Sequence, residues 1–230
     1  MPGPTSFSPP VLFEDREILV VLKPAGMPSQ PDPTGVPDLF SCVSEKCGEL
    51  YLVHRLDRMT GGVLVFAKTR RAARALSLAM AHRDEEGSGS LRKTYLAVAA
   101  GRIDEPFALT DFLLQDRRAQ RSRVVPPGTR GAKVARLTAV PLGCREVLEG
   151  DATLLSVELL TGRFHQIRAQ LSAAGHPLLG DGKYGSRVKC PLALYAERLT
   201  FPHPVSGETV CVTAPSPTGE IWQVFSDLLS

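Results

Sequence analysis

One aspartate flanked by two arginines is the first pattern in this sequence that could carry chemistry. Asp57 follows Arg55 by two positions and directly precedes Arg58. A nearby positive charge favours the ionised form of a carboxyl group and can lower its pKa by about 1–3 units. We therefore expect Asp57 to be a carboxylate. The same residue could also cap a turn or pair with an arginine, so the local pattern leaves a structural and a chemical interpretation open.

A second polar cluster occupies residues 161–168. If residues 164–174 form a helix, His165 and Arg168 are three positions apart and share a face, so both could reach one ligand or one carboxylate. A helix start with solvated polar groups is the alternative. The glycine-rich segment 177–185 has too few regularly spaced glycines for a phosphate loop, and we interpret it as a structural turn.

Apolar runs must hold these clusters in place. The runs 50–56 and 62–67 predict two buried strands, with 57–61 as a polar loop between them. The other patterns predict a strand at 17–22, a mostly irregular segment at 27–38, an amphipathic helix at 70–83, a break at 84–90, and strands at 93–99 and 154–160. We therefore expect an α+β fold with a mixed, mostly antiparallel sheet core and flanking helices.

The composition is that of a globular chain. Its 230 residues are 43% hydrophobic and 22% charged, with a formal net charge of +3. We expect a flexible proline-rich tail at 1–10 and a single domain at 11–230, without a separate N-terminal domain. The small net charge permits an anionic partner but does not demand one.

Cysteine usage and the N-terminus suggest the compartment. The five cysteines form no Cys-x-x-Cys pair and have no nearby histidine at zinc spacing. The N-terminus lacks the pattern of a signal or transit peptide, and no apolar run approaches the roughly 18 residues that span a bilayer. We expect a monomer in the cytoplasm that binds neither membrane nor metal.

Three motifs together identify a family resemblance. They are residues 23–27 (KPAGM), 54–68 (HRLDRMTGGVLVFAK) and 160–168 (LTGRFHQIR), the last continued by Gly-His-Pro at 175–177 and by the turn 180–185. In this order they resemble the RluA-type pseudouridine synthases, and the resemblance covers roughly residues 12–225. It implies a pseudouridine synthase-like catalytic domain.

The resemblance also implies roles for individual residues. Asp57 would be the catalytic aspartate, Arg168 would pair with it, and Tyr95 would pack against the target base. Arg55 would enter the RNA stack where the flipped uridine leaves. Further substrate contacts would come from His54, Leu56, Arg58, Thr60, His165, Gln166 and Ile167. The chain departs from the family at Met59, where an acidic residue is commoner, and at Gly61, where Ser or Thr is usual; both departures bear on loop geometry or substrate preference.

The implied reaction converts uridine in structured RNA, rRNA or tRNA, to pseudouridine. It breaks the N1–C1′ bond, rotates the base and joins C5 to C1′, with no net redox change, so we expect no cofactor and no metal. The carboxylate could add to C1′ or remove a proton from C2′, and the sequence leaves both routes open. The base must first leave its stack, at a cost of a few kcal/mol.

A basic stretch is the expected RNA surface. Residues 117–136 contain seven basic residues and no acidic residue. Phosphate contacts supply affinity without base identity. The residues expected to bind the RNA backbone are Arg117, Arg118, Arg121, Arg123 and Lys133, and a solvated polar hairpin is the alternative.

Two other functions compete with this prediction. One is a catalytically silent RNA-binding protein with the synthase fold, which loss of Asp57, Tyr95 or Arg168 would favour; all three residues are present. The other is a nucleoside hydrolase or glycosidase, which normally needs a second carboxylate within about 5–10 Å. Neither main motif supplies one beside Asp57.

Overall fold

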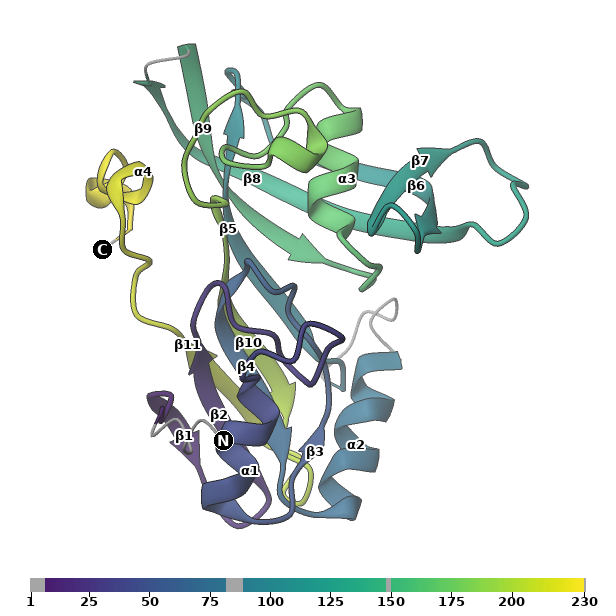
Figure 1. The fold of residues 1–230 in the computed structure, drawn as a ribbon, viewed down its shortest axis with the longest axis vertical. Coiled ribbons are helices and arrows are strands. Elements are labelled where there is room, and N and C mark those ends of the chain that lie inside the picture. Colours follow the sequence, from purple (N-terminus) through teal and green to yellow (C-terminus); the bar gives the residue numbers. More distant parts are fainter. Residues whose placement is uncertain (1–6, 82–88, 148–149, 230) are drawn as a thin grey trace. The chain divides into compact units, whose positions relative to one another are not determined.

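The computed structural model describes residues 7–81, 89–147 and 150–229 (Figure 1). The chain forms two compact units. Unit 1 comprises Met1–Lys93 and Ala196–Pro215, and unit 2 comprises Thr94–Tyr195 and Ser216–Ser230. Most of the predicted tail at 1–10 and of the predicted break at 84–90 lies outside the described residues.

Unit 1 is built on the antiparallel pair β2 (Ile18–Lys23) and β4 (Gly61–Ala67). The register joins Ile18 to Ala67 and Lys23 to Gly62. Both strands are nearly continuous apolar runs and are almost entirely buried, as expected for strands covered on both faces. The other strands of this unit's sheet are β1 (Val11–Glu14), β3 (Tyr51–Leu52), β10 (Leu194–Pro202) and β11 (Thr209–Thr213).

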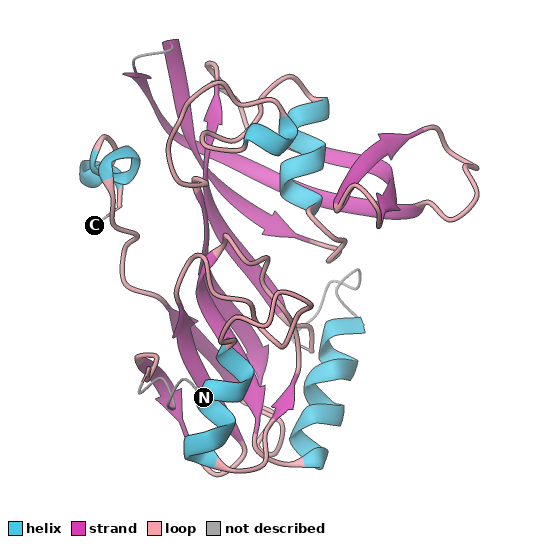
Figure 2. Ribbon diagram, viewed as in Figure 1, coloured by secondary structure: helices cyan, strands magenta, loops and turns pink. Residues whose placement is uncertain are grey.

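Two helices flank these strands (Figure 2). α2 (Arg70–Ala81) confirms the predicted amphipathic helix and packs on β3 and β4. α1 (Leu39–Cys47) was not predicted, although Asp38 caps its N-terminus by accepting a hydrogen bond from the Ser41 N–H. Phe40 of α1 contacts Phe66 of β4, with ring centroids 6.1 Å apart.

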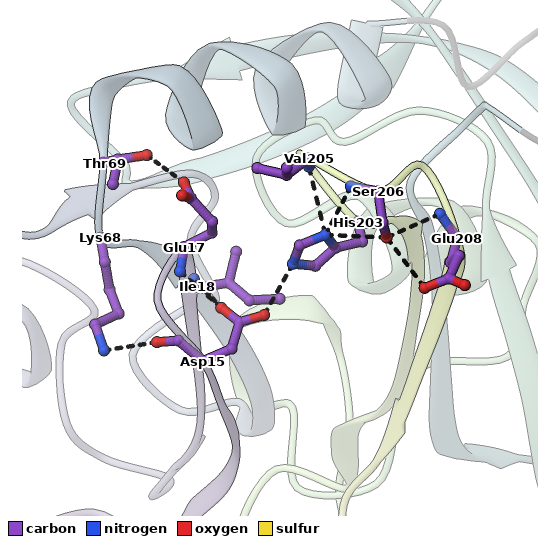
Figure 3. A network of polar contacts seen from close by, with 9 residues as sticks. All are labelled: Asp15, Glu17, Ile18, Lys68, Thr69, His203, Val205, Ser206 and Glu208. Atoms are coloured by element: carbon purple, nitrogen blue, oxygen red, sulfur yellow. Dashed lines mark hydrogen bonds and ion pairs between the residues drawn. The ribbon is translucent and has the colours of Figure 1, made fainter.

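A polar network ties the start of β2 to the hairpin between β10 and β11 (Figure 3). Asp15 accepts hydrogen bonds from the N–H groups of Glu17 and Ile18. Its other carboxylate oxygen lies 2.8 Å from Nε2 of His203. Nδ1 of His203 accepts the N–H of Ser206 at 3.1 Å. These bonds lower the pKa of Asp15 despite its partial burial, which raises it.

Unit 2 contains five strands in the order β5, β9, β8, β6 and β7, and the neighbouring pairs are antiparallel. α3 (Gln166–Ala173) packs on β6 and β7. Trp222 of α4 (Glu220–Gln223) and Phe225 bury their rings in an apolar cluster with Leu96. The strands are β5 (Arg92–Ala100), β6 (Phe107–Asp116), β7 (Arg121–Val125), β8 (Lys133–Val147) and β9 (Gly150–Leu159).

The architecture confirms the α+β class, and most predicted elements are present. Two predictions need correction. The run 50–56 was expected to be a strand, but only Tyr51–Leu52 pairs, and 53–60 is irregular. The helix expected from 164 begins at Gln166, because His165 has a left-handed backbone with φ 51°. Across the described ranges, no helix is long and apolar enough to cross a membrane.

Candidate active site

The Asp57 loop is anchored by a buried lysine at the end of β2. Lys23 is only 1% exposed. Its Nζ donates hydrogen bonds to the carbonyl oxygens of Pro24 at 2.9 Å, Met27 at 2.6 Å and Arg58 at 3.1 Å. One ammonium group therefore joins the turn after β2 to the residue that follows Asp57.

Two further bonds join the same two segments, and a third closes the Asp57 loop on itself. The Gly26 N–H donates to the Arg58 carbonyl at 2.8 Å, and Arg58 Nε donates to the Gly26 carbonyl at 3.0 Å. The Thr60 N–H donates to the Asp57 carbonyl at 3.0 Å, which closes a turn from Asp57 to Thr60. Asp57 thus begins a turn that is held from both sides, and it is half-buried.

Lys23 also sets the charge around this loop. Burial lowers the pKa of Lys23 from 10.5 to about 7, and the negative charge of Asp57 opposes that shift. A neutral amine has two hydrogens and an ammonium has three, so the three carbonyl acceptors favour the charged form. Sequence reasoning identified Arg55 and Arg58 as the neighbouring charges and missed this buried cation.

The predicted substrate contacts of unit 1 differ in exposure. His54 and Leu56 are buried, and His54 Nε2 accepts the Val65 N–H at 3.3 Å. Arg55 and Arg58 are exposed, and Thr60 is buried. The loop therefore exposes the two arginines on either side of the half-buried carboxylate, while His54 contacts β4.

The polar cluster of the third motif is built differently from the prediction. His165 precedes α3 in a left-handed conformation, so it does not share a helical face with Arg168. The two residues meet through Tyr184. Nδ1 of His165 lies 3.0 Å from the Tyr184 hydroxyl, and the Arg168 guanidinium lies 5.0 Å from the centroid of the Tyr184 ring.

Arg168 forms a buried, bidentate ion pair with Asp181. Its Nε and Nη2 donate to the two carboxylate oxygens at 2.6 and 2.8 Å. Both side chains are nearly inaccessible to solvent. Asp181 lies in the turn that the sequence suggested was only structural. Gly180 before it has φ 76°, and a Cβ there would overlap the carbonyl oxygens of Cys190 and Pro191. The turn therefore needs glycine to bring Asp181 under α3.

His165 belongs to a relay of hydrogen bonds that reaches β7. The Ser122 N–H donates to the Tyr184 hydroxyl at 2.8 Å, and the Ser122 hydroxyl donates to the Phe164 carbonyl at 2.6 Å. Burial, together with the positive charges of Arg168 and Lys183, lowers the pKa of His165 to about 3. The ring is neutral at physiological pH, so Nδ1 can accept a hydrogen bond from the Tyr184 hydroxyl.

Gln166, Ile167 and Tyr95, which the sequence also predicts as site residues, lie in unit 2 as well. Gln166 accepts hydrogen bonds from Thr161 and Arg163 and donates to the Arg136 carbonyl, and Ile167 is buried. These bonds fix the start of α3. Tyr95 is buried on β5 opposite Val157.

The predicted RNA-backbone residues lie on the β6–β7 hairpin and at the start of β8. Arg121 and Arg123 point outward from β7, whereas Ser122 between them is buried. The turn from 117 to 120 is exposed. The exposed members of the set are Arg117, Arg118, Arg121, Arg123 and Lys133.

Asp57 lies in unit 1, and Arg168, Tyr95 and the basic hairpin lie in unit 2. The pairing of Asp57 with Arg168 therefore stays a prediction. Among the described ranges, no group of three or more His, Cys, Asp or Glu side chains is arranged to hold a metal ion.

A comparison with protein families matches residues 17–173 to the family described as RNA pseudouridylate synthase. The matched segment contains the Asp57 loop, β5 with Tyr95, and α3 with Arg168.

Several curated proteins are similar over most of the chain. The dual-specificity RNA pseudouridine synthase RluA of Haemophilus influenzae is 32% identical over 90% of this chain and 92% of its own length. Two proteins of Yersinia pestis match 89% of this chain. The tRNA pseudouridine synthase C is 30% identical over 85% of its length, and the ribosomal large subunit pseudouridine synthase C is 34% identical over 65% of its length.

The fold is also found among solved structures. Human RNA pseudouridylate synthase domain containing 1 superposes with a TM-score of 0.76, covering 99% of this chain and 97% of that chain at 23% identity. At this identity the match concerns the fold alone.

Proposed function

The chain belongs to the RNA pseudouridylate synthase family and is an RNA pseudouridine synthase, and we propose that Asp57 is its catalytic carboxylate. The observation that supports this role is the braced turn in which Asp57 lies. Lys23 and Gly26 bond to the backbone of Arg58, the next residue, so the backbone that carries Asp57 is held with little freedom. Preorganisation of this kind contributes to catalysis because the reacting group is already oriented.

Asp57 would react at the ribose of a flipped uridine. The carboxylate either adds to C1′ as the N1–C1′ bond breaks or removes a proton from C2′. The base then rotates, and C5 bonds to C1′. Both routes need an ionised aspartate, and the Lys23 ammonium beside it favours that form.

Three other residues would support the reaction. We propose that Arg168 pairs with Asp57 while Asp181 holds its guanidinium, and that Tyr95 packs against uracil after cleavage. Arg55 is exposed on the Asp57 loop, as required of a residue that enters the RNA stack. The hydrogen bond from Gln166 to the Arg136 carbonyl and the burial of Ile167 support a structural contribution of these two residues in addition to the predicted substrate contact.

We propose rRNA or tRNA as the substrate, because relatives with these names cover most of the chain. The chain would act in the cytoplasm as a monomer and without a metal, as the sequence predicts. Mapping pseudouridines in total RNA with and without the protein would identify the modified positions.

The direct test of the proposal is Asp57→Asn. We expect the purified variant to form no pseudouridine, because an amide can neither attack C1′ nor take a proton from C2′. RNA affinity should stay within about a few fold of wild type, since phosphate contacts supply most of the binding. Pseudouridine is measured by nucleoside chromatography and affinity by filter binding. Asp104→Asn, at an exposed aspartate of unit 2, is the matched control and should remain active.

The same assay separates the competing functions. A silent RNA-binding protein would bind RNA and form no pseudouridine even as wild type. A glycosidase would release free uracil and leave an abasic site, whereas an isomerase leaves the mass of the RNA unchanged. Turnover by Asp57→Asn would remove Asp57 from its role.

A further inference from the structure

The hydroxyl of Thr60 is buried beside the catalytic turn without a hydrogen-bond partner. Thr60 is 2% exposed. Its Oγ1 is inaccessible to solvent and has no partner within residues 7–81, 89–147 and 150–229. Its backbone is well bonded, because the N–H donates to the Asp57 carbonyl. The unpaired group is therefore the hydroxyl alone.

The rest of the loop is not built this way. The Ser29 hydroxyl, which is also buried, donates to the Leu56 carbonyl at 2.8 Å and accepts the Leu56 N–H at 3.1 Å. A buried hydroxyl without a partner is destabilising, because it has lost its bonds to water. Valine has nearly the same shape and no such penalty. Packing alone therefore gives no reason for threonine at this position.

The position of Thr60 indicates which bond its hydroxyl could make. Asp57 and Thr60 are the first and last residues of one turn, and such residues have Cα atoms less than about 7 Å apart. Both belong to unit 1. A threonine hydroxyl is a hydrogen-bond donor, and a carboxylate is an acceptor with two oxygens. One oxygen is needed for the reaction with ribose, and the other has lone pairs that can accept the Thr60 hydroxyl.

We propose that Thr60 is a positioning residue whose hydroxyl, in the RNA complex, donates a hydrogen bond to the Asp57 carboxylate oxygen that does not react. This inference rests on the proposed role of Asp57. Thr60 forms no covalent bond and transfers no proton; it fixes the rotation of the carboxylate and favours its ionised form. An interaction that forms only after RNA binds does not stabilise the free enzyme, and it raises the rate to the extent that it is stronger in the transition state than in the bound ground state.

The test compares Thr60→Val with Thr60→Ser. Valine removes the hydroxyl and keeps the shape, so the single-turnover rate at saturating RNA should fall about 10- to 100-fold, the range for loss of a hydrogen bond to a charged group. Serine keeps the hydroxyl and should restore most of the rate. RNA affinity should weaken modestly in Thr60→Val, because the bond forms only in the RNA complex, and should stay near the wild-type value in Thr60→Ser. In Thr60→Val the acid limb of the pH–rate profile should move to higher pH, because the ionised carboxylate has lost a donor.

Stability to urea is the second measurement, and in Thr60→Val it should not fall although the rate falls. Thr60→Val should be at least as stable to urea as wild type, because it removes an unpaired buried hydroxyl. Ser44→Ala is the matched control. The Ser44 hydroxyl on α1 is likewise buried and without a partner among the described residues, and Ser44 lies outside the catalytic loop. This variant should also keep or gain stability, but its activity should equal that of wild type.

Three results would overturn the proposal: a wild-type rate in Thr60→Val, a Thr60→Ser variant as slow as Thr60→Val, or a clear loss of stability in Thr60→Val. Asp57→Asn separates this failure from that of the proposed function. If Asp57→Asn is inactive and Thr60→Val is normal, only the role of Thr60 is wrong. If Asp57→Asn forms pseudouridine, the proposal that Asp57 is the catalytic carboxylate is wrong as well.

Discussion

Arg168 has a buried counter-ion of its own in unit 2. The Asp181 carboxylate takes the Nε and Nη2 edge of the guanidinium. A guanidinium has five N–H donors, so one bidentate carboxylate uses only part of them. This geometry makes Asp181 the residue that orients Arg168. Asp181 would hold the guanidinium in this way whichever acceptor contacts the rest of that guanidinium during the reaction.

Substituting Asp181 should affect both stability and activity. In Asp181→Asn the guanidinium stays buried without a counter-charge, and breaking a buried pair in this way costs about 3–5 kcal/mol. The double variant Arg168→Met with Asp181→Leu buries no charge and should recover most of this stability, but it should form no pseudouridine. Urea unfolding and product analysis measure the two effects. An active double variant would exclude Arg168 from the reaction, and an Asp181→Asn variant as stable as wild type would contradict the cost of breaking the pair.

The residues that sequence reasoning missed act over long separations. Lys23 bonds to Arg58, 35 positions away, and Arg168 bonds to Asp181, 13 positions away. Local composition identified Asp57 because its arginine neighbours are adjacent in sequence. It could not identify partners that only the fold brings close. The left-handed conformation of His165 was equally hidden, because nothing in a Phe-His-Gln segment demands it.

The elements that were predicted correctly are those with strong, continuous apolar patterns. β2, β4 and β9 are such runs, and α2 has an apolar stripe. α1 was missed because its segment follows a proline-rich stretch and is short, although Asp38 and Gly48 mark its ends. The length of β3 was overestimated because Val53, His54 and Leu56 are buried by packing rather than by strand pairing.

The β6–β7 hairpin carries the prediction that concerns RNA affinity. Alternation along β7 places Arg121 and Arg123 on the exposed face, and Ser122 anchors the strand to Phe164 and Tyr184. Replacing Arg118, Arg121 and Arg123 together by Ala should weaken binding. It should also flatten the slope of log affinity against log salt by roughly 2–3 units, at about 0.7–0.9 per phosphate contact.

Single-turnover rates at saturating RNA should stay close to wild type in the triple variant, because these residues are predicted to contact phosphate rather than the flipped base. Arg102→Ala is the control, since Arg102 is an exposed arginine of unit 2 outside the hairpin. Its salt slope should match wild type. An unchanged slope in the triple variant would mean that the hairpin is only solvated.

At the scale of the whole molecule, the division into two units left no trace in the sequence. Two of the points at which the chain passes between units, after Lys93 and after Tyr195, fall inside β5 and β10. A crossing inside a strand has no linker composition, so a search for proline- or glycine-rich boundaries could not find it. Asp57 belongs to unit 1 and Arg168 to unit 2, and the expectation of a single catalytic domain stays a prediction.

The stability of the molecule should decrease between pH 7 and pH 5 because of His165. Its pKa is about 3 in the folded protein, against 6.5 for the unperturbed side chain. Between these values the unfolded chain binds a proton that the folded chain does not. The contribution of His165 to the free energy of unfolding is therefore fully present above pH 6.5 and is lost as the pH drops towards 3. At pH 5 the loss should be about 2 kcal/mol.

The comparison that tests this assignment is His165→Asn, because asparagine tolerates a left-handed backbone and does not titrate between pH 5 and 7. Urea unfolding should show that the free energy of unfolding falls between pH 7 and pH 5 in wild type, and that this fall exceeds the fall in the variant by about 2 kcal/mol. Asp15, whose pKa lies below 3.8, stays ionised across this window and adds no slope there. Amide exchange should locate the effect, with protection in α3 and β7 reduced at pH 5 in wild type and preserved in His165→Asn. If both proteins lose the same stability, burial and the charges of Arg168 and Lys183 do not hold His165 in its neutral form, and another group is responsible for the acid sensitivity.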